Sequence, residues 1–350
     1  MNDEKKSKSC GIISIYGLNN YGNRLQNYAL IHTLQDMGCR CKNFLDLKKT
    51  WYIKYCAARI LKNQLCMFRR TLLFRKIDKK LVKNVYAKKR KIKRQEHFDY
   101  LICGSDQIWT LNLASSYYFA EFAPKEKRIA YAASFGVSSI PDFQKERYRK
   151  WLNGFKSISV RESSGAEIIN NLIGIDVEVL IDPTMLLSRQ EWRELSEKPR
   201  FNTDKKYILT YFLGNVDAER SRYINNICKI CGLELIDLNA KQPSKFYYKT
   251  GPAEFLWLVE HSAVVFTDSF HGSVFSILFE VPFLVFNRDE QISEMSSRID
   301  TLLHTMKLED RRFNNQTVQD VFKKEYAHVG AILKNEKKRS IAFLEKALNI

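Results

Sequence analysis

Residues 263–275, AVVFTDSFHGSVF, predict a buried strand that ends abruptly in polar residues and restarts as a helix. This junction places His271 at the start of the helix. In an open α/β sheet, ligands bind beyond the carboxyl ends of the strands, and backbone N–H groups at a helix start attract anions. The first hypothesis is therefore a phosphate or carboxylate site that includes Ser269, His271 and Gly272.

Length and composition favour a soluble protein of two domains. The chain has 350 residues with 45% hydrophobic and 13% aromatic content, which excludes a mainly disordered protein. The most apolar region, 262–286, is interrupted by charged residues, so we expect no transmembrane helix. The N-terminal apolar run predicts a first strand rather than a signal peptide, and eight scattered cysteines suit a reducing cytoplasm.

The net charge of +18 is concentrated in one basic segment, residues 48–95. Between Lys48 and Arg94 the chain has 18 lysines and arginines and a single acid, Asp78. Apolar residues recur there at helical spacing, so a basic amphipathic helix on an anionic membrane surface is as compatible with the segment as a nucleic-acid site is. A plain solvated face is the further alternative.

Strands alternate with helices in two similar blocks, which predicts parallel α/β sheets. The first block begins with a strand at 11–16 and a helix at 24–37, and a charged stretch at 196–206 reads as a linker. We expect an N-terminal Rossmann-like domain (1–200, with an insertion at 48–95), a C-terminal one (201–325) and a final amphipathic helix (326–350) that packs across both. Two such domains would face a cleft, as in GT-B transferases.

Two polar loops follow predicted strands of the first block. The turn around NNYGN can wrap a ligand, because asparagine and glycine tolerate unusual backbone angles. Asp106, in GSDQIW, can act as a general base or orient a hydroxyl, although a helix cap is the commoner role for such a residue. The loop residues concerned are Asn20, Tyr21, Gly22, Asn23, Gly104, Ser105 and Gln107.

Three arginines are candidates for anion binding. Arg161 ends a predicted strand, where its planar guanidinium could grip a carboxylate or phosphate or simply pair with Glu162. Arg288 and Arg298 follow the strand at 283–286 and could reach the crevice beside His271. The sequence contains no metal-binding or phosphate-loop motif, so we expect no protein-held metal.

The motifs NNYGN, GSDQIW, SFG (134–136), VRES (160–163), DPT (182–184) and TDSFHGSVFSILF occur in this order. Together they resemble the polysaccharide pyruvyl transferase family from about Gly11 to Leu303. The resemblance implies a GT-B-like fold and transfer of a pyruvyl group from phosphoenolpyruvate to sugar hydroxyls of a bacterial glycan or a lipid-linked precursor. It implies no cofactor besides this donor substrate, and a cytoplasmic enzyme that can lie on the inner face of the plasma membrane.

By the same resemblance, Asp106 activates or orients the hydroxyl, Arg161 binds the anionic groups of the donor, and His271 binds phosphate or transfers a proton. Many members have an arginine two residues before this histidine, where this chain has Ser269. Arg288 or Arg298 could compensate. The alternatives are a nucleotide-sugar-dependent glycosyltransferase of GT-B type and, from another class, a nucleic-acid-binding protein; we disfavour nucleic acid as a partner.

Overall fold

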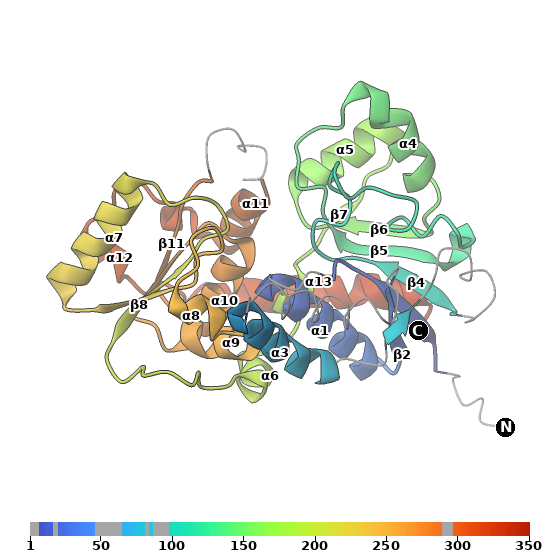
Figure 1. Cartoon of the computed structure of the whole chain (residues 1–350). Coiled ribbons are helices and arrows are strands. Elements are labelled where there is room, and N and C mark those ends of the chain that lie inside the picture. The colour runs from blue at the N-terminus through green and yellow to red at the C-terminus, as the bar shows by residue number, and fades with distance from the viewer. Residues whose placement is uncertain (1–6, 17–19, 46–64, 81–83, 87–97, 289–296) are drawn as a thin grey trace. The chain divides into compact units, whose positions relative to one another are not determined.

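The computed structural model describes residues 7–16, 20–45, 65–80, 84–86, 98–288 and 297–350 (Figure 1). The chain forms two compact units. Unit 1 comprises residues 1–55, 78–187 and 334–350, and unit 2 comprises 56–77 and 188–333. Among the described helices, none combines the length and apolar composition needed to cross a membrane.

Unit 1 is built on a parallel sheet with the strand order β3-β2-β1-β4-β5-β6-β7. The order reverses between β1 and β4, so the chain winds outward in both directions from this point. The strands are β1 (Ser9–Ile13), β2 (Arg40–Leu45), β3 (Asn84–Tyr86), β4 (Tyr100–Cys103), β5 (Arg128–Ala133), β6 (Ser157–Val160) and β7 (Glu178–Val179).

Helices cover both faces of this sheet. Figure 1 shows α4 (Asp142–Leu152) and α5 (Ser163–Ile173) on one face, and α1 (Tyr21–Asp36) and α13 (Val329–Leu348) on the other. Beside α4, the ring of Trp109 stacks on Phe119 with centroids 5.0 Å apart. This fully buried aromatic core fixes the loop that follows β4.

Unit 2 has a smaller parallel sheet with the order β11-β10-β8-β9, which reverses between β8 and β10. Its strands are β8 (Tyr207–Tyr211), β9 (Glu234–Asp237), β10 (Val264–Thr267) and β11 (Phe283–Val285). Its helices are α3 (Leu65–Lys80), α6 (Arg189–Leu195), α7 (Ala218–Cys231), α8 (Lys245–Tyr248), α9 (Pro252–Glu260), α10 (Phe270–Phe279), α11 (Ser297–Met306) and α12 (Val318–Val321).

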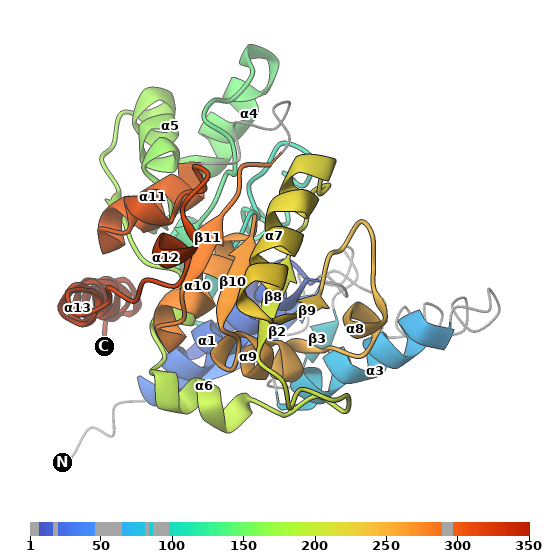
Figure 2. The ribbon, with the colours of Figure 1, turned by 90° about the vertical axis from the view of Figure 1, so that its left-hand side faces the viewer.

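Alternation along the strands explains the layers of unit 2. Ile208 and Phe266 belong to the core beneath α7 and α12, whereas the Tyr211 ring lies 5.1 Å from Phe255 of α9 on the opposite face. Figures 1 and 2 agree that α7 lies on one side of the sheet and α9 and α10 on the other. Both faces are thus covered, as the almost continuously apolar strands require.

The division of the chain differs from the expected boundaries. The second, longer stretch of unit 2 begins at Ser188, not at residue 201. Ser188 caps α6, and Trp192 of that helix is fully buried with its ring 5.1 Å from Phe275 of α10. The burial of this one tryptophan ties residues before the expected linker to the second unit.

Residues 65–77 of the basic segment belong to unit 2, although we expected the whole segment in the N-terminal domain; residues 78–80 and β3 belong to unit 1. Arg70 of α3 is fully buried, and its Nη1 donates to the carbonyls of Tyr247 and Thr250, each at 2.7 Å. Its guanidinium carbon lies 3.7 Å from the centre of the Tyr247 ring. The inner face of α3 is therefore anchored in unit 2.

This packing changes the interpretation of the apolar spacing in α3. Phe74 and Ile77 are buried, whereas Leu72 is 42% exposed. Ile60, Leu61 and Leu81, which contributed to the predicted membrane-binding face, lie outside the described residues. Part of the apolar pattern thus serves packing within the protein.

The final helix was expected to pack across both domains, and residues 334–350 belong to unit 1. Lys156 donates to the carbonyl of Ala347 at 2.6 Å and to Asn349 Oδ1 at 3.1 Å. Leu344 and Leu348 are fully buried. Most of the last helix, from residue 334 on, thus packs in unit 1, whereas residues 329–333 belong to unit 2.

Candidate functional site

In unit 1, the predicted loops meet at the carboxyl ends of β1 and β4, where the strand order reverses. Asn20 caps α1 by accepting a hydrogen bond from the Asn23 amide at 3.4 Å. Tyr21, Gly22 and Asn23 consequently form the first turn of α1, which begins three residues earlier than expected. The reversal point is where open α/β sheets bind their ligands.

The Asp106 carboxylate lies at the centre of this arrangement and is only 7% exposed. It accepts hydrogen bonds from the Asn23 side-chain amide, from the Gln107 backbone amide at 2.9 Å and from Arg161 Nη2 at 3.3 Å. The backbone of Asp106 is left-handed, with φ of 71°, and bridges to Ala133 next to β5. These contacts hold the carboxylate in one orientation.

Arg161 is held between two carboxylates inside unit 1. Its Nη1 lies 2.5 Å from Asp182 Oδ2, and its side chain is 1% exposed. Burial alone would lower the pKa of Arg161, but the carboxylates of Asp182, Asp106 and Glu162 raise it overall. Its role in binding the donor stays a prediction; what the geometry shows is that it orients Asp106.

The remaining motifs of unit 1 complete the same network. Ser105 Oγ donates to Asp182 Oδ2 at 3.1 Å, and Asp182 also accepts from the amide of Thr184 at 3.0 Å. Glu162 accepts from the amides of Phe135 and Gly136, at 2.8 and 3.3 Å. GSDQIW, SFG, VRES and DPT are therefore parts of one hydrogen-bonded structure.

Two positions of this network favour glycine because other atoms of unit 1 lie very close to them. Gly104 has φ of +135°, and a Cβ there would lie 2.1 Å from the Tyr131 carbonyl oxygen. Gly136 has φ of +66°, and a Cβ there would lie 2.1 Å from Gln107 Nε2. A side chain at Gly104 would clash with the backbone of β5, whereas one at Gly136 would displace the Gln107 side chain, and both positions have backbone angles that side chains rarely adopt.

In unit 2, the N-terminus of α10 follows β10 directly, as the opening stretch of sequence predicted. Ser269 caps the helix, with its Oγ accepting from the Gly272 amide at 3.4 Å. A Cβ on Gly272 would lie 2.5 Å from Thr267 Oγ1, so glycine allows the helix to start against the strand end. His271 is the second residue of α10 and is 5% exposed.

The structure brings Arg288 to the same edge of the sheet. Its Nε lies 3.3 Å from Oδ2 of Asp268, the residue just before the helix cap, and its side chain is 18% exposed. Arg298 is buried in the first turn of α11. Asp268 was not among the sequence candidates, although its place directly after β10 was the available signal.

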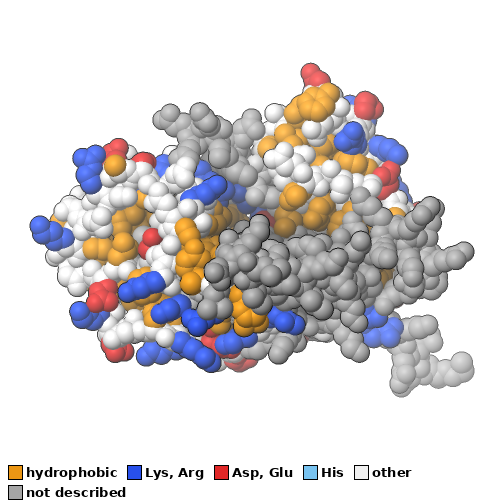
Figure 3. All heavy atoms as spheres, in the orientation of Figure 1, with side chains coloured by type: hydrophobic (Ala, Val, Ile, Leu, Met, Phe, Trp, Pro, Cys, Tyr) orange, Lys and Arg blue, Asp and Glu red, His pale blue; other side chains and the backbone are white. Residues whose placement is uncertain are grey.

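Two described cavities contain none of the candidate residues. One, of about 330 Å³ in unit 2, is lined by Phe201, Asn202, Lys205, Glu234, Lys245, Phe246 and Lys249. Figure 3 shows lysine and arginine side chains gathered on this face of unit 2. Of the lysines that line the cavity, Lys245 is the first residue of α8 and Lys249 directly follows this helix. The other, of about 500 Å³ in unit 1, is lined by residues including Lys8, Cys39 and Ile350.

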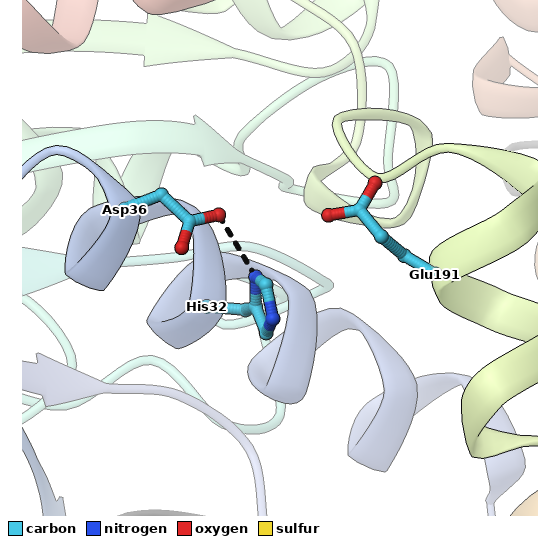
Figure 4. A group of neighbouring side chains, drawn as sticks. All are labelled: His32, Asp36 and Glu191. Carbon is cyan, nitrogen blue, oxygen red and sulfur yellow. Dashed lines mark hydrogen bonds and ion pairs between the residues drawn. The ribbon is translucent and has the colours of Figure 1, made fainter.

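Figure 4 shows another pair of titratable side chains, His32 and Asp36, one turn apart in α1 and joined at 3.0 Å. Glu191, drawn in the same view, completes the capping box of α6 by accepting from the Ser188 amide at 2.6 Å. Each has a structural partner of its own. That the protein holds no metal stays a prediction.

The chemistry of the two edges differs. Unit 1 presents an oriented carboxylate among amide and guanidinium donors, which suits hydroxyl activation. Unit 2 presents an imidazole and a guanidinium beside the first turn of a helix, which suits anions.

Comparison with known protein families shows which family the chain belongs to. A family model described as polysaccharide pyruvyl transferase matches residues 20–290. The chain belongs to this family. The match covers the predicted site residues from Asn20 to Arg288 and leaves out Arg298, the final helix and β1.

Solved structures show the fold of this pyruvyl transferase family member. The co-structure of MnaA and UDP from S. aureus aligns with a TM-score of 0.55 at 10% identity, covering 98% of this chain and 97% of that chain. A putative UDP-N-acetylglucosamine 2-epimerase from Listeria monocytogenes aligns with a TM-score of 0.51 at 10% identity, covering 98% and 97%. These likenesses support the predicted GT-B-like α/β fold. No curated protein matches the chain.

Proposed function

We propose that this polysaccharide pyruvyl transferase takes its pyruvyl group from phosphoenolpyruvate and forms a ketal with two hydroxyls of a sugar. The proposed acceptor is a bacterial glycan or its lipid-linked precursor, and the proposed place of reaction is the cytoplasm. The observation that carries the proposal is the edge of unit 2, where His271, Arg288 and the N-terminus of α10 lie at the carboxyl ends of β10 and β11. Phosphoenolpyruvate carries a phosphate and a carboxylate, and this edge suits such a ligand.

The proposed reaction proceeds by proton addition and two attacks on one carbon. A proton adds to the methylene carbon of phosphoenolpyruvate and leaves an oxocarbenium-like centre at the adjacent carbon. The first sugar hydroxyl attacks this carbon and gives up its proton. The carbon–oxygen bond to phosphate then breaks, the second hydroxyl closes the ketal, and its proton leaves with the released phosphate.

Each residue has a proposed role in this sequence. Asp106 accepts the proton of the attacking hydroxyl or orients this hydroxyl. It can do so because Asn23 and Arg161 hold its carboxylate in place. His271 binds the phosphate or supplies the proton, and Arg288 binds an anionic group of the donor. Asn20 to Asn23 and Gly104 to Gln107 shape the acceptor side.

The test combines the purified protein with phosphoenolpyruvate and a panel of bacterial glycans. We expect release of inorganic phosphate that depends on a glycan, and loss of this release in Asp106→Asn and His271→Asn. Calorimetry with phosphoenolpyruvate and with UDP separates this proposal from a nucleotide-sugar glycosyltransferase. Binding of UDP without binding of phosphoenolpyruvate would overturn it.

A further inference from the structure

One buried carboxylate of unit 2, that of Asp268, has no role in the proposed function so far. Asp268 directly follows β10, and β10 lies beside β8 at the point where the strand order of unit 2 reverses. Its side chain has no exposed surface. Burial of a carboxylate is costly unless donors surround it, so its partners indicate why it is there.

The partners of Asp268 come from three strand ends. Its Oδ1 accepts from the Leu213 amide at 2.7 Å, and its Oδ2 accepts from the Gly214 amide at 2.8 Å, both just after β8. Arg288, after β11, approaches Oδ2 with Nε at 3.3 Å. A Cβ on Gly214 would lie 3.0 Å from the same oxygen, so an alanine there would require Asp268 to shift by a few tenths of an ångström. The ends of β8, β10 and β11 are thus tied together by one side chain.

The ion pair with Asp268 holds the Arg288 side chain at the end of β10. Thr267 and Val285 are register partners of β10 and β11, so Asp268 and Arg288 leave the sheet at the same edge. Ser269 and His271 begin α10 at this edge, immediately after Asp268. The Arg288 guanidinium is therefore kept near the residues that lead into α10.

We infer that Asp268 is a positioning residue that holds Arg288 for the anionic group of the donor. Arg288, paired with Asp268, supplies from the end of β11 the guanidinium that Ser269 cannot provide. This inference rests on the proposed function. It predicts that Asp268 affects donor binding only through Arg288.

The experiment is a double-mutant cycle on binding, which needs no acceptor. Affinities for phosphoenolpyruvate and for inorganic phosphate are measured by calorimetry for the wild type, Arg288→Ala, Asp268→Asn and the double variant. We expect each single substitution to weaken binding on the order of tenfold or more, as for loss of a charge-assisted hydrogen bond. The double variant should bind no more weakly than Arg288→Ala, because Asp268 then has nothing left to position.

Asp237→Asn is the matched control. Asp237 ends the neighbouring strand β9, and its Oδ1 accepts from the Asn239 amide and from Thr210 Oγ1, both at 2.9 Å. Asp237→Asn disturbs hydrogen bonds comparable to those of Asp268 but does not affect Arg288. The affinity for phosphoenolpyruvate should therefore equal that of the wild type. If Asp268→Asn fails to fold, Gly214→Ala tests the same point, because its Cβ would press on Asp268 Oδ2.

The outcomes separate the two proposals. A wild-type protein that binds neither phosphoenolpyruvate nor phosphate overturns the proposed function, and this inference with it. A wild-type protein that binds, with Asp268→Asn and Gly214→Ala both unchanged or with additive losses in the cycle, overturns the role of Asp268 alone.

Discussion

At the scale of single residues, Arg161 shows ion pairs that its place in the sequence did not reveal, while its contact with the donor stays a prediction. Its position after a strand suggested an anion site, and the structure gives its guanidinium two carboxylates, Asp106 and Asp182. The sequence contained all three residues. Only the sheet, in which β4, β5, β6 and β7 lie side by side, brings them together. Arg161 is 55 residues from Asp106 and 21 residues from Asp182.

We predict that Arg161→Met destabilises unit 1 by about 3–5 kcal/mol, because it leaves two buried carboxylates without their counter-charge. Chemical denaturation measures the change. Arg193→Ala is the control, since Arg193 is 46% exposed in its pair with Glu260 and should cost less than about 1 kcal/mol. A stable Arg161→Met that merely binds phosphoenolpyruvate weakly would favour a direct donor contact instead.

At the scale of elements, the apolar spacing correctly predicted a helix at α3. It did not reveal what the faces of this helix contact. Apolar spacing and basic charge are compatible with a membrane surface, a solvated face or packing in the core. The three-dimensional position of Tyr247 and Thr250 decides that the inner face, with Arg70, is buried. The spacing is therefore partly explained by packing within unit 2.

Two neighbouring arginines of α3 test this packing. Arg70→Ala should lower the free energy of unfolding by about 3 kcal/mol, because two buried carbonyls lose a charged donor. Arg69→Ala removes the same charge from the exposed side of the helix and should change it by less than about 0.5 kcal/mol. Equal effects of the two substitutions in thermal or urea unfolding would contradict the burial of this face.

A contact between the starts of β1 and β4 predicts that the stability of unit 1 depends on pH. Hydrogen bonds from the backbone amide and hydroxyl of Ser9 hold the pKa of Asp99 below its usual value. The stabilisation is therefore present above the unfolded pKa of about 3.9 and is lost as the pH falls through the lower folded value.

Urea unfolding of the wild type and Asp99→Asn between pH 7 and 2.5 measures this contribution. The wild type should be the more stable above pH 5, and the difference should shrink below pH 4. Glu167→Gln, on the exposed side of α5, is the control and should show no such convergence. A constant difference for Asp99→Asn down to pH 2.5 would refute the assignment.

At the scale of the whole molecule, each unit is assembled from separate stretches of chain. Unit 1 takes its last helix from the C-terminus, and unit 2 takes α3 from the first hundred residues. A division into consecutive domains, as the linker-like stretch at 196–206 suggested, misses the place of α3. Composition shows which stretches of the chain are polar, but it does not show which unit a stretch packs in. The burial of Trp192 and Arg70 shows that their helices pack in unit 2.

Truncation tests the membership of the last helix. A chain that ends at Leu333 loses the buried Leu344 and Leu348 and the carbonyl that accepts from Lys156, so unit 1 should not fold stably. A chain that ends at Leu348 keeps the helix and should retain a cooperative melting transition. A cooperative transition of undiminished temperature in the shorter chain would contradict this placement.

The sequence by itself determined the class of fold and the location of the unit-2 edge. The periods of the strands and helices are local properties, and the TDSFHG junction carries its strand, cap and glycine within a few consecutive residues. The motif order was enough to indicate the family. Tertiary structure alone decided that Arg161 faces Asp106 and Asp182, that Asp268 joins three strand ends, and that α3 packs in unit 2. These are contacts between residues distant in the chain, and no local pattern records them, because they depend on which strands become neighbours and which side chains lose their water.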